Sequence, residues 1–262
     1  MTGHRPRKRF GQNFLHDPGV VQRIVTAVDA GPDDVVVEIG PGRGALTRPL
    51  LERAGTLHVV ELDRDLVPAL ERLAGENPRL IVHAADALRF DFCAIAPADG
   101  KLKVVGNLPY NISTPLLFHL MEQLHCIGPM HFMLQKEVVE RMAAGPGSKT
   151  YGRLSVMIQY HCRVTPLFQV GPGAFRPPPK VDSMVVRLEP RPEPPAGEVP
   201  TRALAAVVRA AFGQRRKTLR NTLKGLLDEE AIRAAGIDPA TRPENVSLEG
   251  FAALARQYAA RR

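Results

Sequence analysis

The stretch DVVVEIGPGRGALT, residues 34–47, decides the fold. An apolar run rich in valine ends at Glu38 and Ile39, and a turn with glycines at 40, 42 and 44 follows it. Such a run predicts a strand buried on both faces. Glycines directly after a strand permit a tight turn into a helix and let a ligand approach the backbone closely. The stretch therefore predicts the first strand-turn-helix unit of a parallel sheet, although many α/β proteins use such a turn only structurally.

Strands of the same kind recur along the chain. They are predicted at residues 34–40, 57–62, 79–86 and 101–107, with helix-compatible stretches between the first three pairs. The pattern continues to a final strand at 183–190. Short apolar strands alternating with helices are typical of a parallel sheet that helices cover on both faces. The fold class is therefore α/β.

Each of the four strands closes on a carboxylate or an amide. These residues are Glu38, Glu61, Asp86 and Asn107, spaced by about one strand-helix unit each. Ligands of open parallel sheets bind outside the carboxyl ends of the strands. We therefore expect the four side chains to converge on one crevice.

The glycine spacing G-x-G-x-G favours a nucleoside without phosphates, such as S-adenosylmethionine, over NAD. A dinucleotide site prefers G-x-G-x-x-G, and here the third glycine comes one residue early. Glu61 suits hydrogen bonds to both ribose hydroxyls, and Asp86 can accept from an adenine amine. Each also has a simpler interpretation: Glu61 could be a solvated strand-end acid, as we expect of Asp63 and Asp65, and Asp86 could cap a helix.

The segment NLPY, Asn107 to Tyr110, faces the same crevice. The Asn107 amide oxygen and a backbone carbonyl at Pro109 could both accept from one exocyclic amine and aim its lone pair at an electrophile. Tyr110 could stack on a flat base, whereas Leu108 packs. In isolation the segment would be a strand-ending turn, but the preceding strand ends favour an amine site.

The C-terminal part differs in character. A Pro/Glu-rich linker at 189–200 separates an expected catalytic domain, 1–190, from an expected helical domain, 191–262. Residues 201–227 look helical, and Arg216, Arg220 and Lys224 recur every four residues with Lys217 beside them. We interpret this as one basic helix face for phosphates, or as an ordinary solvated face. The glycine-rich segment 143–153 is expected to be a mobile loop over the active site, or a surface connection.

The net charge of +8 lies entirely at the two ends of the chain. Residues 1–17 carry +3 and residues 191–262 carry +5, while Lys and Arg cancel Asp and Glu in between. Basic flanks on a neutral body are typical of a core that grips a polyanion, and equally of ordinary solubility charge.

Other features exclude several classes. No apolar run is long enough to cross a membrane and no signal peptide is evident, so we expect a cytoplasmic protein. The three cysteines, at 93, 126 and 162, are widely spaced. They are expected to be buried, reduced thiols, with neither a disulfide framework nor a zinc or other metal site.

The chain as a whole resembles the bacterial small-subunit (16S) ribosomal RNA adenine-N6,N6-dimethyltransferases. The resemblance spans nearly the whole length, and no core motif departs from the family pattern. The motifs that carry it are RFGQNFLHD, VVEIGPGRGALT, VVELDRDL, NLPYNIS, LQKEVVERMAA, TYGRLSV, FRPPPKVDSMVVRL and FGQRRKTLRNTL.

The resemblance implies a seven-stranded, Rossmann-like methyltransferase sheet with a small helical C-terminal domain. It also implies S-adenosylmethionine as cofactor and 16S rRNA of the small subunit as partner, with no DNA or membrane partner and a monomeric protein. Carried over by position, the cofactor contacts are Asn13, Leu15, Gly40, Glu61, Asp86 and Asn107. The target base is met by Asn107, Leu108, Pro109, Tyr110 and, as a second aromatic, Phe175, although Leu15 and Phe175 could also simply pack.

The implied reaction is dimethylation of N6 on two adjacent adenosines in a hairpin loop near the 3′ end of 16S rRNA. Three rivals stay open. They are a large-subunit rRNA dimethyltransferase of the macrolide-resistance type, a non-catalytic assembly factor, and, more remotely, a DNA adenine methyltransferase.

Overall fold

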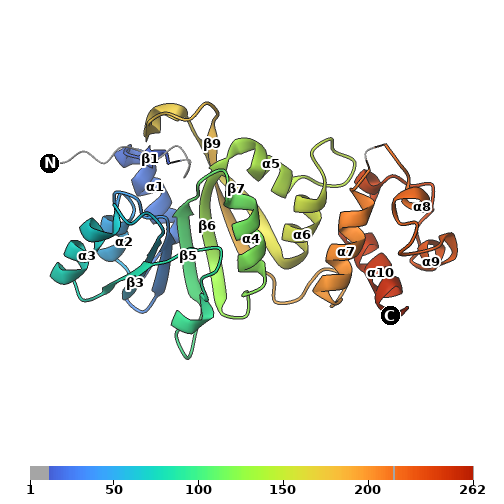
Figure 1. The fold of residues 1–262 in the computed structure, drawn as a ribbon, viewed down its shortest axis with the longest axis horizontal. Helices are drawn as coiled ribbons and strands as arrows, with labels where there is room; N and C mark the ends of the chain where they lie inside the picture. The colour runs from blue at the N-terminus through green and yellow to red at the C-terminus, as the bar shows by residue number, and fades with distance from the viewer. Residues whose placement is uncertain (1–11, 215, 262) are drawn as a thin grey trace. The chain divides into compact units, whose positions relative to one another are not determined.

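The computed structural model describes residues 12–214 and 216–261. Seven strands form one sheet in the order β4-β3-β2-β5-β6-β9-β7 (Figure 1). Neighbours from β4 to β6 are parallel, and β9 lies antiparallel to β6. The fold predicted from the strand pattern is thus confirmed. The strand bounds are β2 Val35–Ile39, β3 Thr56–Glu61, β4 Leu80–Ala84, β5 Leu102–Asn107, β6 Ile127–Gln135, β7 Cys162–Val170 and β9 Ser183–Pro190.

The order of the strands fixes where a ligand can bind. From β2 the chain steps outward to β3 and β4 on one side, and then returns to β5 on the other side of β2. The helices after β2 and β5 therefore leave in opposite directions and open a crevice at the carboxyl ends of these two strands. The Gly-rich turn and the NLPY segment follow these strands directly.

Helices connect strands along the chain and pack on the sheet. Pro18 at the first turn of α1 lacks the N–H that would be unsatisfied there, and the Asp17 carboxylate accepts the Val20 N–H at 3.0 Å, so the helix begins at this point. Further along the chain, α2 packs on β3 and α3 on β4. The bounds are α1 Pro18–Val28, α2 Thr47–Leu51, α3 Val67–Glu76, α4 Ser113–Met121 and α5 Lys136–Ala143.

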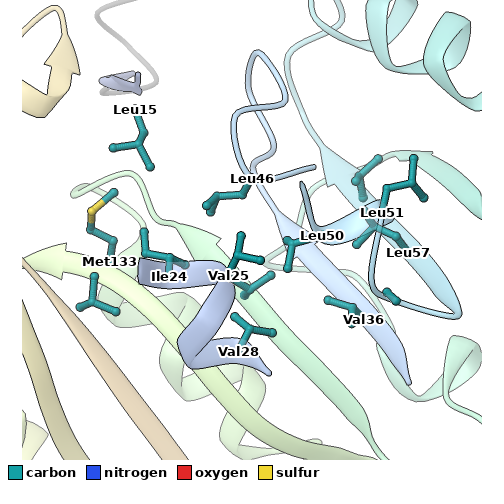
Figure 2. Close-up of a cluster of buried hydrophobic side chains, with 14 of the residues drawn as sticks. Leu15, Ile24, Val25, Val28, Val36, Leu46, Leu50, Leu51, Leu57 and Met133 are labelled. Carbon is teal, nitrogen blue, oxygen red and sulfur yellow. The ribbon is translucent and has the colours of Figure 1, made fainter. Parts of the chain in front are cut away.

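One hydrophobic cluster binds α1 to the sheet. Ile24, Val25 and Val28, at helical spacing, bury their side chains against the strands (Figure 2). Leu15 points from the short strand β1, Phe14–Leu15, toward Met133 of β6 (Figure 2). Burying side chains of this size contributes roughly 1.5–3 kcal/mol each, so the cluster fixes the segment that precedes α1.

A two-stranded antiparallel sheet holds that N-terminal segment. β1 pairs with β8, Phe175–Arg176, and the register places Leu15 opposite Phe175. The His16 N–H also donates to the Ala174 carbonyl at 2.9 Å. Residues 12–16 are therefore attached to a part of the chain about 160 residues away.

The chain divides into two compact units, residues 1–139 with 165–190, and residues 140–164 with 191–262. This division differs from the expected boundary, because residues 140–164 group with the C-terminal helices. The helices that fall wholly in the second unit are α6 Arg153–His161, α7 Thr201–Ala211, α8 Leu219–Thr222, α9 Glu229–Ala234 and α10 Leu248–Ala259. Whether 1–190 and 191–262 fold as separate domains stays a prediction.

Hydrogen bonds tie the irregular segments of the second unit to its own helices. The Tyr160 hydroxyl donates to the Gly197 carbonyl at 2.9 Å and accepts the Val199 N–H at 3.0 Å, so the Pro/Glu-rich linker is pinned near its end. In the segment 143–153, Gly147 N–H donates to the Glu244 carbonyl at 2.7 Å. The mobility of that segment stays a prediction.

The prediction of one long basic helix at residues 201–227 is wrong. The helix α7 ends at Ala211, Gly213 follows, and Arg216 has a left-handed backbone with φ +67°. A new helix, α8, begins only after Thr218 and is four residues long. Arg216, Arg220 and Lys224 therefore share no helix face. The four-residue spacing in the sequence missed the break because a left-handed residue other than glycine leaves no compositional mark.

The expectation for the cysteines is wrong in part. Cys162 is buried and outside any disulfide bond, but Cys93 and Cys126 are joined by a disulfide bond with their Cα atoms 5.4 Å apart. The two residues precede β5 and β6, which are neighbours in the sheet. Pairing of strands brings them together, and the spacing along the chain could not reveal it. Among the described residues, no helix combines the length and the hydropathy needed to cross a membrane.

Candidate cofactor and substrate site

A cavity opens at the carboxyl ends of β2, β3, β4 and β5, where the strand-end residues were expected to converge. The segment 12–15 forms a further wall. Of the predicted site residues, all but Phe175 line it: Asn13, Leu15, Gly40, Glu61, Asp86, Asn107, Leu108, Pro109 and Tyr110. The structure therefore brings these residues together at one cavity, and their assignment as site residues and their roles stay predictions.

The Gly-rich turn forms one side of the cavity. Gly40, Gly42 and Gly44 have φ of +67°, +58° and +80°, a region that costs L-residues with side chains about 1–2 kcal/mol each. A Cβ on Gly42 would lie 3.0 Å from the Phe14 ring, whereas a Cβ on Gly40 would meet nothing within 4 Å. Since Gly40 lines the cavity, the space that its missing side chain leaves is available to a ligand.

Glu61 is held by the backbone at the end of β3. Its Oε2 accepts the Gly42 N–H at 3.1 Å and its Oε1 accepts the Asp63 N–H at 2.8 Å. Burial raises the pKa of the carboxyl above its usual value, and the N–H groups of Asp63 and Gly42 oppose that rise. Each carboxylate oxygen has a second lone pair, so the side chain is oriented and can still accept from ligand hydroxyls.

Glu38 is a second acid beneath the turn. It is 2% exposed, and the Thr47 hydroxyl donates to its Oε2 at 2.6 Å. Burial raises the pKa of Glu38 to about 8; the Thr47 hydrogen bond opposes the rise, and the neighbouring Glu61 charge adds to it. Glu38 is therefore predominantly neutral at pH 7.

Asp63 contradicts the expectation that it is a solvated acid. It is 2% exposed, lines the cavity, and accepts from the Gln12 side chain at 2.8 Å and from the Asp65 N–H at 3.2 Å. Asp63 thereby connects the N-terminal segment to the loop after β3. The charged sequence ELDRD gave no signal for this, since the bonded partner Gln12 lies 51 residues away in the chain.

Asp86 and Leu62 lie on the β3 and β4 side of the cavity. Asp86 Oδ1 accepts the Leu88 N–H at 3.0 Å, which fixes the carboxylate and leaves its other oxygen for a ligand amine. Leu62 is 50% exposed and lines the cavity, although the sequence reasoning did not select it. The exposed leucine can pack on the flat face of a base, and the carboxylate beside it can accept from the amino group at the edge of that base. The apolar residue directly after Glu61 is the signal that could have found it.

Asn107 is oriented by the N-terminal segment. Its Nδ2 donates to the Asn13 backbone carbonyl at 3.0 Å. This bond distinguishes the two ends of the amide, because the nitrogen is used and the oxygen remains as an acceptor. The side chain of the next residue, Leu108, is 1% exposed and packs as expected. Its N–H donates to the Met133 carbonyl at 3.1 Å. The Pro109 carbonyl accepts the Ile112 N–H at 3.2 Å, which closes the turn.

Tyr110 is anchored at its hydroxyl. The Oη atom lies 2.9 Å from the Ser183 hydroxyl on β9, and burial raises the pKa of the phenol. Ser183 itself is 1% exposed, so the anchor is rigid. The ring is thereby fixed at the cavity wall by a group at its far end, and its face can serve a planar ligand.

Phe175 lies elsewhere, which contradicts its expected stacking role. Its side chain is 2% exposed in the hydrophobic cluster with Leu15, its partner in the β1–β8 pair. A ring buried on all sides cannot stack on a base in the cavity. Phe14 lines the cavity instead, and the Arg43 guanidinium lies 4.7 Å from its ring centroid.

Comparison with known proteins identifies the family of the chain. A family model described as ribosomal RNA adenine dimethylase matches residues 3–260. Proteins named ribosomal RNA small subunit methyltransferase A are similar over nearly their full length. The one from Pseudomonas aeruginosa is 59% identical over 256 residues, 98% of this chain and 96% of that protein. The one from Methylococcus capsulatus is 60% identical over 255 residues, 97% and 98%.

Solved structures share the fold. A dimethyladenosine transferase from Plasmodium falciparum has a TM-score of 0.76 at 27% identity, covering 92% of this chain and 95% of that one. The 23S rRNA methyltransferase ErmE has a TM-score of 0.71 at 26% identity, covering 94% and 100%. The chain belongs to the ribosomal RNA adenine dimethylase family and has the Rossmann-like fold of its methyltransferases.

Proposed function

We propose that this enzyme dimethylates the N6 amines of two adjacent adenosines in a hairpin loop near the 3′ end of 16S rRNA. The observation that carries the proposal is the orientation of Asn107, whose amide nitrogen is bound by Asn13 so that its oxygen is left to accept from an amine. The high identity to proteins named for the small subunit supports the choice of substrate.

The cavity fits S-adenosylmethionine as methyl donor. The open space at Gly40 admits a ligand next to the backbone, and Glu61 offers oriented oxygens to ribose hydroxyls. Asp86 and Leu62 suit an adenine edge and face, respectively. When bound, S-adenosylmethionine supplies an electrophilic methyl group on its sulfonium centre. The position of Asn13 and Leu15 in the cavity wall makes them part of the same pocket.

Asn107 and the turn after it prepare the amine. An adenine N6 lone pair is delocalised into the ring and is a poor nucleophile. Two acceptors on its protons, the Asn107 Oδ1 and a backbone carbonyl at Pro109, oppose that delocalisation and direct the lone pair. Positioning of this kind replaces a strongly basic group, since effective concentration alone can lower a barrier by several kcal/mol.

Tyr110 holds the base. Stacking of one base on an aromatic ring contributes roughly 1–3 kcal/mol, and the bond to Ser183 removes rotational freedom from the ring before the base arrives. The adenosines must leave their stack to reach the cavity, which favours a loop over a duplex. Contacts from the basic ends of the chain to phosphates would add affinity that falls with salt. We propose that the enzyme is a cytoplasmic monomer.

The test is a substrate competition. Labelled S-adenosylmethionine is offered with undermethylated small subunits, large subunits and duplex DNA, and label should enter small-subunit RNA at N6,N6-dimethyladenosine. Label in large-subunit RNA or DNA alone would replace the proposed substrate. A non-catalytic assembly factor would transfer no label to any of the three substrates.

The Asn107→Ala variant tests the amine orientation within the same assay. It should lose transfer by at least about a hundredfold, since one positioned hydrogen-bonding group typically contributes that much. Its affinity for the small subunit should stay near that of the parent. Normal transfer by Asn107→Ala would refute the orientation while leaving the substrate unchanged.

A further inference from the structure

Three soft donor groups lie together outside the cavity. The Sγ atoms of Cys93 and Cys126 and a ring nitrogen of His125 are all within 4.8 Å of one another. The Cys126 carbonyl accepts the N–H of Leu102, at the first residue of β5, at 3.0 Å. The cluster therefore lies at the amino-terminal edge of the sheet, at the opposite end of β5 from Asn107. None of its three residues lines the cavity.

The backbone around the cluster is held independently of the sulfur atoms. The Gln123 side chain accepts the Phe92 N–H at 2.7 Å and donates to the Phe90 carbonyl at 3.3 Å. The Gln123 carbonyl in turn accepts the Cys126 N–H at 3.1 Å. Gln123 thus joins the segment before Cys93 to the turn that carries Cys126, so the donors stay near one another when the bond between the sulfurs is absent.

His125 adds a third possible metal ligand that plays no part in the disulfide bond. Its Nε2 lies 3.2 Å from the Cys93 Sγ, although the residue is exposed. A third donor at this distance, directly beside a cysteine pair, is the composition of a thiolate and imidazole metal site.

We propose that the reduced form of this cluster binds one zinc ion through Cys93 Sγ, Cys126 Sγ and His125 Nε2, with water in the fourth position. Two thiolates at about 2.3 Å from one zinc ion are about 3.8 Å apart. The sulfurs must therefore separate from their bonded distance, and the Cα separation of 5.4 Å permits this by side-chain rotation. The disulfide and the zinc-bound cluster are alternative states of the same residues.

The conversion of the disulfide to the zinc-bound cluster balances in atoms, electrons and protons. A dithiol reductant gives two electrons and two protons to the disulfide, which becomes two thiols, and the reductant is oxidised to its own disulfide. Binding of the zinc ion then releases both thiol protons to solvent, because thiolates are the ligands. The site would tie the turn at Cys93 to the start of β6 in a reducing environment, where the disulfide does not persist.

The experiment uses the full chain, reduced with a dithiol that is then removed without oxygen. Zinc content per chain is measured after dialysis against limiting zinc, and cobalt replaces zinc in a parallel sample. We expect one zinc per chain, together with the thiolate-to-cobalt charge-transfer band and the visible bands of tetrahedral cobalt. The thermal midpoint of the reduced protein should rise when zinc is added.

Variants separate the cluster from adventitious binding. Cys93→Ser with Cys126→Ser should lose the zinc and the charge-transfer band, and His125→Gln should weaken zinc binding at least about tenfold. His125 is exposed, so that variant keeps the fold. Cys162→Ala, which removes a cysteine outside the cluster, should bind as the parent does. No zinc in the reduced parent, or equal zinc in the double serine variant, would overturn the proposal.

Discussion

Glu38 offers a quantitative test of how the cavity is charged. Its pKa is raised from 4.5 to about 8 in the folded protein, because the carboxyl is buried and lies near Glu61. The folded state thus holds the proton more tightly than the unfolded state. The resulting stabilisation is fully present below pH 4.5 and is lost progressively as the pH rises through 8.

The size of the effect follows from the two pKa values. Each pH unit between them costs about 1.4 kcal/mol of stability, so the whole loss is at most about 5 kcal/mol. Between pH 5.5 and pH 9 the loss is about 3 kcal/mol. The Glu38→Gln variant has no such term and can still accept from the Thr47 hydroxyl. Its free energy of unfolding should therefore gain about 3 kcal/mol relative to the parent over that range.

Urea unfolding of both proteins at several pH values between 5.5 and 9 gives the measurement. The contributions of all other ionisable groups are common to both proteins and cancel in the difference, apart from the response of Glu61. Val37→Ala, in the same buried strand, changes stability without changing an ionisable group, and its difference from the parent should not vary with pH. A difference for Glu38→Gln that is equally flat would refute the conclusion that Glu38 is neutral at pH 7.

Three further predictions concern single side chains. Tyr110→Phe removes the bond to Ser183 and should lower stability by about 1 kcal/mol in urea unfolding while keeping most methyl transfer, whereas Tyr110→Ala should lose at least tenfold in kcat/KM. In Gly40→Ala the alanine must adopt φ +67° and places a methyl group toward the cavity. The free energy of unfolding should therefore fall by about 1–2 kcal/mol. Cofactor affinity, measured by calorimetry, should fall at least tenfold. His131 is 2% exposed, neither ring nitrogen has a hydrogen-bond partner among the described residues, and its pKa is lowered to about 4 by burial and by Arg187. The parent should therefore lose up to about 3 kcal/mol as the pH falls from 6.5 through 4, of which about 2 kcal/mol falls between pH 7 and pH 5. His131→Leu should remove that loss of about 2 kcal/mol in unfolding curves at pH 7 and pH 5.

The fold and the convergence of the strand ends on one cavity could be predicted because they rest on local patterns. Valine-rich runs mark buried parallel strands, and the topology of such a sheet brings the ends of its strands together. Glu61, Asp86 and Asn107 consequently line one cavity although they are far apart in sequence. No tertiary detail was needed for that conclusion.

The errors arose where burial depends on distant partners. Asp63 is buried and bonded to Gln12, 51 residues away, and Phe175 is buried where β8 pairs with β1. The Cys93 and Cys126 pair depends on the alignment of β5 with β6, and the break at Arg216 depends on a backbone conformation without a sequence signature. None of these can be read from spacing along the chain.

The pairing of β1 with β8 has a consequence for the order in which the protein becomes functional during its synthesis. The wall at residues 12–15 leaves the ribosome before the residues that it contacts, since the bond from Asn107 to Asn13 needs residue 107 and the β-pair needs residues 175 and 176. The nascent chain can form β2 to β5 and the Gly-rich turn, and with them the Asp63 and Asn107 partners of this wall, before its β-pair partner at residues 175 and 176 is made. The wall therefore gains its full set of contacts only after residue 176 has emerged, and a ribosome stalled earlier should display a fragment whose segment 14–15 lacks its β-pair partner.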